Sequence, residues 1–110
     1  MRRIAAFTDV LRSAVARRGA ALMAVCNVTP DSFSDGGLYL DAARARARVD
    51  ELVEEGADII DIGGESTRPG APAVPAATQI ERVLPVLQYA VTRACVSIDT
   101  TSPEVARVCL

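Results

Sequence analysis

The sequence predicts a parallel α/β fold, and two observations support this prediction. Short, mostly apolar segments rich in β-branched residues recur at nearly equal intervals, over residues 22–26, 58–62 and 95–98. The stretches between them carry apolar residues at helical spacing. Because a parallel pair of strands needs a crossover connection of this length, the order β-α-β-α-β-α with right-handed crossovers follows.

Helices are expected over residues 41–55, over 76–93 and from 101 onward. The first ends before Gly56, a residue type that commonly terminates helices. Pro85 lies inside the second helix and is expected to kink or split it. Thr101 and Glu104 have the spacing of a capping box at the start of the third helix.

The two ends of the chain are interpreted separately. Residues 1–20 form an N-terminal extension, with a candidate amphipathic helix from about Thr8 that ends at Gly19. This helix fits either a plug at the bottom of a barrel or a frayed extension. Residues 21–110 hold about three β/α units, whereas a (β/α)₈ barrel typically needs roughly 250 residues. We therefore expect a fragment or a truncated product.

Composition restricts the function classes. The 110 residues are 50% hydrophobic and 24% charged with a net charge of −2, so neither nucleic acid nor a membrane is an expected partner. Three separated cysteines with mostly apolar neighbours favour buried, reduced thiols and a cytoplasmic location. The absence of histidine excludes a His-ligated zinc site or a Ser-His or Cys-His pair within this sequence.

Polar residues follow each predicted strand, over 27–37, over 63–70 and at 99–100. In parallel α/β folds ligands bind at the carboxyl ends of the strands, so these clusters are expected along one rim. Neither Gly36-Gly37 nor Gly63-Gly64 belongs to a dinucleotide-binding or P-loop motif. The sequence therefore gives no support to a nucleotide site of either kind.

The same clusters carry a family resemblance. Residues 27–37 and 56–70 resemble the two N-terminal motifs of dihydropteroate synthases, and 97–100 is similar to the third-strand motif. The resemblance runs from about Ala21 to Leu110 and implies a (β/α)₈ TIM barrel, of which this chain holds about the first three units. It also implies a folate-pathway transferase. Such an enzyme condenses (7,8-dihydropterin-6-yl)methyl diphosphate with 4-aminobenzoate (p-aminobenzoate), and Mg²⁺ assists the release of pyrophosphate.

Three residues are candidates for catalysis. Asn27 offers an amide oxygen, a hard ligand that suits Mg²⁺, and the resemblance makes it the metal-contacting residue; the alternative is an Asx-turn. Arg68 can bind phosphate oxygens in a bidentate manner, or it is a solvated loop charge. The Asp99 carboxylate can accept two N–H groups from a pterin, or it organises the turn after its strand.

Other residues are candidates for substrate binding. Ser66 and Thr67 offer hydroxyl donors beside Arg68, and the resemblance implies that Phe33 and Pro69 form apolar walls for 4-aminobenzoate. Asp61 lies within the second strand, where it either orients ligands or is a satisfied core carboxylate.

The resemblance implies that later strands supply the remaining site residues, so we expect this chain alone to be inactive. Two alternatives stay open: a non-catalytic, truncated pterin-binding protein and a relative of the pterin-dependent methyltransferases. The sequence leaves the oligomeric state open, with a homodimer of the full-length protein as one candidate.

Overall fold

A computed structural model describes residues 7–29, 38–65, 69–70 and 72–110, with the backbone alone for 38–41. The elements are α1 (Phe7–Arg18), β1 (Met23–Asn27), α2 (Leu38–Glu54), β2 (Ile59–Gly63), α3 (Ala76–Ala90), β3 (Cys95–Ile98) and α4 (Pro103–Cys109). This order confirms the predicted alternation of strands and helices. The first two strands begin one residue later than predicted, and α2 begins three residues earlier.

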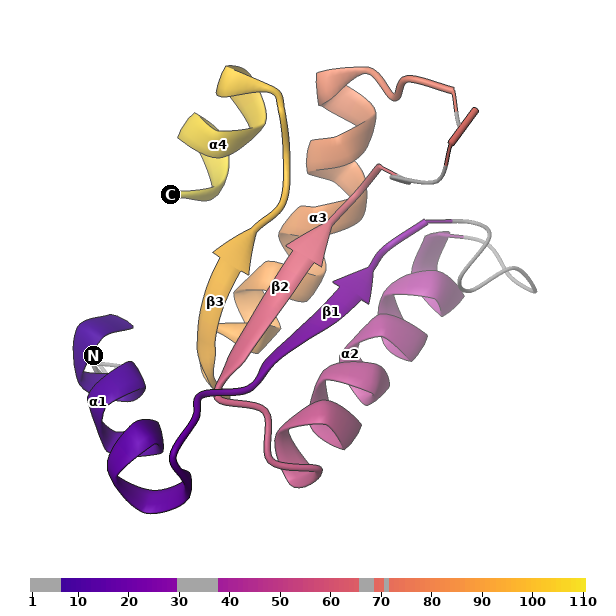
Figure 1. Ribbon diagram of the computed structural model, residues 1–110. Helices are drawn as coiled ribbons and strands as arrows, with labels where there is room; N and C mark the ends of the chain where they lie inside the picture. Colours follow the sequence, from indigo (N-terminus) through magenta and orange to yellow (C-terminus); the bar gives the residue numbers. More distant parts are fainter. Residues whose placement is uncertain (1–6, 30–37, 66–68, 71) are drawn as a thin grey trace.

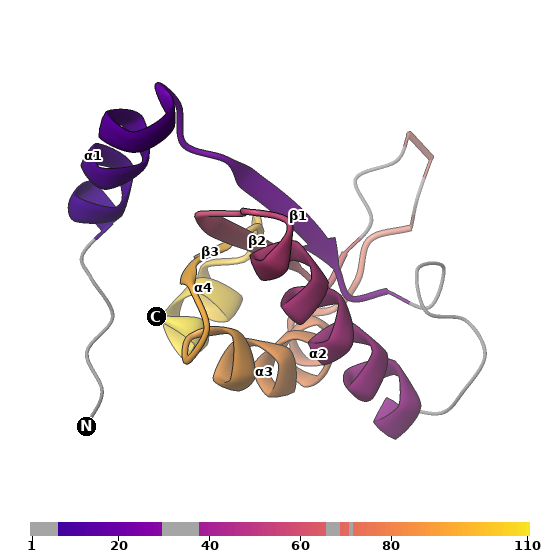
Figure 2. The ribbon, with the colours of Figure 1, turned by 90° about the horizontal axis from the view of Figure 1, so that it is seen from below.

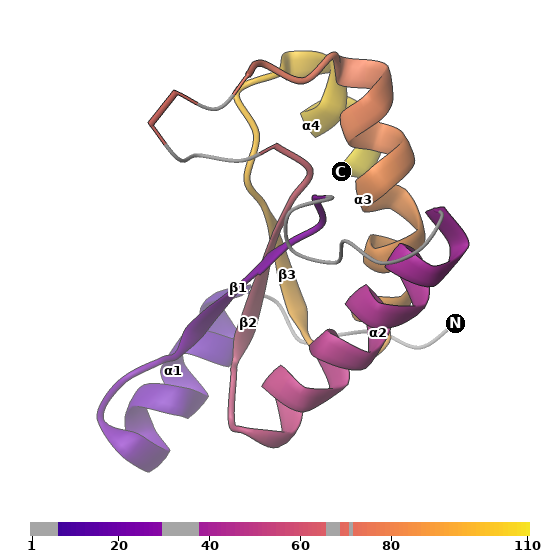
Figure 3. The same ribbon diagram turned by 90° about the vertical axis from the view of Figure 1, so that its right-hand side faces the viewer.

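The three strands form one parallel sheet in the order β1-β2-β3 (Figure 1). In the register, Val25 lies opposite Asp61, which lies opposite Ser97. Figure 3 shows α2, α3 and α4 on one side of the sheet, and α1 on the other side near the lower end of the strands. Figure 2, seen from below, shows the same separation of α1 from the other helices.

The hydrophobic core lies between the sheet and helices α2 and α3. It includes Cys26, Ile60 and Ile62 from the strands, which pack with residues such as Val49 and Val83 from the helices. Because side chains alternate across a strand, the residues between these positions face the other way. We call this second surface the open face; it carries Met23, Val25, Asn27, Ile59, Asp61, Gly63, Cys95, Ser97 and Asp99.

Helix α3 corrects one sequence expectation. It runs without a break through Pro85, so of the two predicted outcomes the split is excluded, and the kink stays a prediction. A proline removes one intrahelical hydrogen bond, but burial of Val83, Val86 and Leu87 on both sides of it favours the continuous helix. The helix ends at Ala90, three residues before the predicted end.

The start of α4 corrects a second sequence expectation, the position of the helix cap. Ser102 is the N-cap, and its hydroxyl accepts a hydrogen bond from the Val105 N–H at 3.3 Å. The N-cap is therefore one residue later than predicted, and Val105 at the third position after it has no side-chain acceptor to complete a capping box. Pro103 occupies the first turn, where a missing N–H costs nothing.

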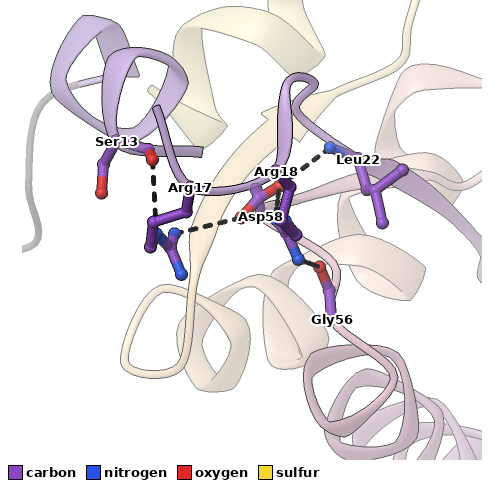
Figure 4. A network of polar contacts seen from close by, with 6 residues as sticks. All are labelled: Ser13, Arg17, Arg18, Leu22, Gly56 and Asp58. Carbon is purple, nitrogen blue, oxygen red and sulfur yellow. Dashed lines mark hydrogen bonds and ion pairs between the residues drawn. The ribbon is translucent and has the colours of Figure 1, made fainter. Parts of the chain in front are cut away.

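Helix α1 forms as predicted, and Gly19 ends it with φ +81°. Its apolar side is only partly covered, since Ala14 is fully buried but Phe7 and Val15 are about half accessible. Its last turn is nevertheless held to the base of β2, because Arg18 pairs with the Asp58 carboxylate and donates to the Gly56 carbonyl at 3.0 Å (Figure 4). Whether α1 closes the bottom of a barrel stays a prediction.

Helices α2 and α3 are also joined by a polar contact. The Tyr89 hydroxyl donates to the Asp50 carboxylate at 2.6 Å, and Arg93 pairs with the same carboxylate at 3.0 Å. The hydrogen bond to Asp50 raises the pKa of Tyr89, and burial adds to the effect.

None of the helices in the described part of the chain has the length and apolarity that a membrane span requires.

Candidate functional site

The carboxyl ends of the strands bring Asn27, Gly63 and Asp99 to one rim of the open face. Asn27 pairs with Gly63 in the register. The Val28 N–H donates to the Gly63 carbonyl at 2.7 Å, and the Asp99 N–H donates to the Ile62 carbonyl at 2.8 Å. These backbone bonds extend the ladder past the strand ends and fix the two polar residues on either side of the glycine. We call Asn27, Gly63 and Asp99 the carboxyl rim.

Gly63 is required by the position of its neighbour. A Cβ at this position would lie 3.2 Å from the Asp99 carbonyl oxygen and 3.4 Å from the Asp99 Cβ. A side chain at this position would therefore require the Asp99 backbone to shift by a few tenths of an ångström. Since Asp99 is itself exposed, the glycine lets this carboxylate stand close to β2 while keeping it accessible to a ligand.

Asp61 lies one row below the rim, on the same face. The Ser97 hydroxyl, directly across the sheet, donates to its carboxylate at 2.5 Å. Asp61 is half-buried, and a carboxylate at that position needs a polar partner, which Ser97 provides. This contact fits both a ligand-orienting carboxylate and a satisfied structural one, and the ligand role stays a prediction.

The connection after β2 is held at both ends. At its start, a Cβ on Gly64 would lie 3.0 Å from the Gln79 carbonyl oxygen, and Arg82 donates to the Gly64 carbonyl at 2.9 Å. Farther along, the Glu65 carboxylate accepts from the Val74 N–H at 2.7 Å. Glu65, Gln79 and Arg82 were not among the site residues predicted from the sequence. A polar Gln79 on the apolar side of α3 was the available signal.

Several predicted site residues are not placed by the structure. Phe33, Ser66, Thr67 and Arg68 lie outside the described residues. Pro69 is described and exposed. The site as described therefore consists of the carboxyl rim, the Asp61–Ser97 pair below it and the base of the connection after β2.

The donor set bears on the expected metal. Among the described residues, no group of three or more His, Cys, Asp or Glu could hold a metal ion. Mg²⁺ is usually bound through one or two protein oxygens, with water and substrate phosphates as its other ligands. A single amide oxygen on Asn27 therefore fits a magnesium ion that arrives with a diphosphate, but it does not fit a cage built of protein ligands.

Cys26 does not belong to the rim. It is 2% exposed and points to the helix side of the sheet, where burial raises the pKa of its thiol and nearby Arg48 partly opposes the rise. A neutral, buried thiol is not a nucleophile for a ligand on the open face. The three cysteines are free, as expected, although Cys95 and Cys109 are only half-buried.

Comparison with known proteins identifies the family. The sequence profile of pterin-binding enzymes matches residues 23–110, which include all three strands and the whole carboxyl rim. The chain belongs to the pterin-binding enzyme family. The match begins at the first residue of β1, so α1 lies outside it.

Within this family, the chain is similar to curated proteins named as dihydropteroate synthases. A dihydropteroate synthase of Streptococcus pyogenes is 50% identical over 93 residues, which cover 83% of this chain and 35% of the relative. A probable bifunctional folylpolyglutamate synthase/dihydropteroate synthase of Halobacterium salinarum is 52% identical over 91 residues, or 82% of this chain and 11% of the relative. The chain thus spans about a third of the length of the Streptococcus relative.

Solved structures confirm the fold class. A Clostridium difficile dihydropteroate synthase, determined in the presence of pteroic acid, matches with a TM-score of 0.75 and 43% identity over 81% of this chain and 35% of that one. A Xanthomonas albilineans dihydropteroate synthase with 4-aminobenzoic acid also has a TM-score of 0.75, with 50% identity over 81% of this chain and 33% of that one. These neighbours are TIM barrels, so the three β/α units are part of a barrel fold, as predicted.

Proposed function

We propose that the complete protein containing this chain is a dihydropteroate synthase. It would condense (7,8-dihydropterin-6-yl)methyl diphosphate with 4-aminobenzoate to give 7,8-dihydropteroate and diphosphate. The observation that carries the proposal is the carboxyl rim, where an amide and an exposed carboxylate flank a glycine in a chain about half identical to synthases. The Clostridium protein was determined in the presence of pteroic acid, which joins a pterin to 4-aminobenzoate, and the Xanthomonas protein with 4-aminobenzoic acid; both support ligands of this class here.

Asp99 is the proposed pterin-binding group. The 2-amino-4-oxopyrimidine edge of a pterin presents neighbouring N–H donors, and one carboxylate accepts both in parallel. The exposure of Asp99 leaves its oxygens accessible from the open face. Asp61, held by Ser97, would lie beneath the ring as a second acceptor on the same face.

Asn27 and Arg68 are the proposed groups on the diphosphate side. When magnesium is bound, it supplies positive charge to the leaving diphosphate, and Asn27 would hold it through the amide oxygen. Arg68 would bind the phosphate oxygens with two parallel N–H bonds, and Ser66 and Thr67 would add hydroxyl donors. Stabilising the charge of the leaving group is the main requirement of this displacement, so no strong base is needed from this part of the chain.

The 4-aminobenzoate ring would lie against Phe33 and Pro69. Both residues belong to the connections after β1 and β2, which leave the sheet at the carboxyl rim. The rest of the site would come from parts of the protein that this chain does not include. The free cysteines favour a cytoplasmic location, and a homodimer of the complete protein stays a prediction.

The proposal is tested by incubating the complete protein with both substrates and Mg²⁺ and measuring dihydropteroate and diphosphate together. Equal amounts of the two products, formed only when both substrates are present, are expected. Pterin binding without any product would instead indicate a non-catalytic pterin-binding protein. If the complete protein neither binds the pterin nor forms product, the proposal is refuted.

A further inference from the structure

Gln79 is a buried residue whose side-chain nitrogen and oxygen both form hydrogen bonds. It lies in the first turn of α3 and is 3% exposed. Burying a side-chain amide is unfavourable unless its polar atoms are paired. The Gln79 Nε2 donates to the Val74 carbonyl at 2.9 Å, and its Oε1 accepts from the Thr100 hydroxyl at 2.9 Å. This pairing explains why a polar residue is tolerated on the buried side of α3.

The two partners of Gln79 belong to different connections at the carboxyl rim. Val74 is near the end of the connection between β2 and α3, where its N–H is bound by the Glu65 carboxylate. Thr100 follows β3, and its hydroxyl oxygen accepts from the Ser102 N–H at 3.0 Å. One amide therefore joins the connection after β2 to the turn after β3.

This link restricts Asp99 from its C-terminal side. On its N-terminal side, the Asp99 N–H is already bonded to the Ile62 carbonyl. Thr100, the next residue, is fixed by Gln79 through its side chain. With both sides of Asp99 held, the backbone that carries its carboxylate is fixed by the sheet and by α3 together.

We propose that Gln79 is a positioning residue for the pterin, acting through Thr100 to hold the Asp99 carboxylate in its binding direction. The inference rests on the proposed function, since that function makes Asp99 the pterin-binding group. Gln79 itself lies beneath the rim and does not touch the substrate. Its removal should therefore weaken pterin binding while the reacting groups stay present.

The test compares matched variants of the complete protein. Gln79→Met keeps the length of the side chain but removes both hydrogen bonds, and Gln88→Met is the control on the exposed side of the same helix. Thr100→Val removes the hydroxyl, Thr100→Ser restores it, and Thr101→Val is the exposed neighbouring control. Calorimetric titration gives the Kd for the pterin diphosphate, and a thermal scan gives the Tm of each variant.

We expect Gln79→Met and Thr100→Val each to raise the pterin Kd about five- to tenfold, the effect of one lost hydrogen bond. The variant with both Gln79→Met and Thr100→Val should have a pterin Kd no higher than the higher of the two single variants, because both substitutions remove the hydrogen bond between Gln79 and Thr100. Thr100→Ser and the two controls should bind like the wild type. A lower Tm with an unchanged Kd in Gln79→Met would overturn the proposal and leave a purely structural role.

A second readout separates this inference from the function. If the wild type does not bind the pterin at all, the proposed function fails, and hydrogen exchange then decides the role of Gln79. Amides of residues 99–102 should exchange faster in Gln79→Met than in Gln88→Met. Equal exchange in these two variants would show that Gln79 does not hold the Asp99 segment.

Discussion

At the scale of single residues, the site depends on a glycine as much as on its polar neighbours. Gly63 leaves room for Asp99, whose backbone would otherwise meet a Cβ at 3.2 Å. Asn27 lies on the other side of the same glycine through the parallel register. Two polar groups suited to different parts of one substrate are thereby held on one rim by backbone hydrogen bonds.

Asn27→Ala should weaken the dependence on magnesium. The substitution removes the amide oxygen that we propose as a metal ligand, so the Mg²⁺ concentration for half-maximal activity of the complete protein should rise about tenfold or more. Asn27→Asp keeps an oxygen ligand and should remain closer to the wild type. An identical Mg²⁺ titration for Asn27→Ala and the wild type would exclude this role.

At this scale, the sequence predicted which residues reach the rim but not what holds them there. Asn27 and Asp99 were found because polar residues at strand ends follow from the order of residues alone. The link from Val74 through Gln79 to Thr100 could not be found in that way, because its three residues come from different segments. Only the packing of α3 beside the sheet brings them together.

At the scale of elements, a charged network joins the last turn of α1 to the start of β2. The Asp58 side chain is 8% exposed and pairs with Arg18, while the Leu22 N–H donates to it at 2.8 Å (Figure 4). Arg17 lies farther away, with 3.8 Å between its Nη2 and Asp58 Oδ1. The network therefore fixes the passage from α1 into β1.

Arg18→Ala should destabilise the complete protein by about 1.5–3 kcal/mol, because the nearly buried Asp58 carboxylate loses the nearer of its two charged partners. Arg12→Ala, on the exposed side of the same helix, should change the free energy of unfolding by less than about 0.5 kcal/mol. Urea denaturation of the two variants measures the difference. Equal stabilities would show that Arg18 does not anchor α1.

The elements were well predicted where a local signal sets them and less well where packing does. Gly19 ends α1 and the strand segments were placed within one residue, since apolar runs and glycines act locally. Pro85 did not split α3, because burial along the helix outweighs the lost hydrogen bond. The cap of α4 moved to Ser102, whose hydroxyl is the one that meets the Val105 N–H.

At the scale of the whole molecule, the open face exposes apolar side chains that a complete barrel would bury. Met23 and Val25 are more than half exposed on it, although they are large apolar residues of strand β1. In a (β/α)₈ barrel the face opposite the helices is the packed interior. Since this chain covers about a third of its synthase relatives, we expect the remaining strands of the complete protein to bury these residues.

The most direct test of the account is a calorimetric titration of the complete protein with the pterin diphosphate, comparing the wild type with Asp99→Asn. The amide keeps the size of the side chain but replaces one acceptor oxygen by an NH₂ donor, so it cannot accept two parallel N–H bonds and the Kd should rise at least about tenfold. Asp9→Asn, an exposed change in α1, is the control and should bind like the wild type. An unchanged Kd for Asp99→Asn would contradict the assignment of the carboxyl rim as the pterin site.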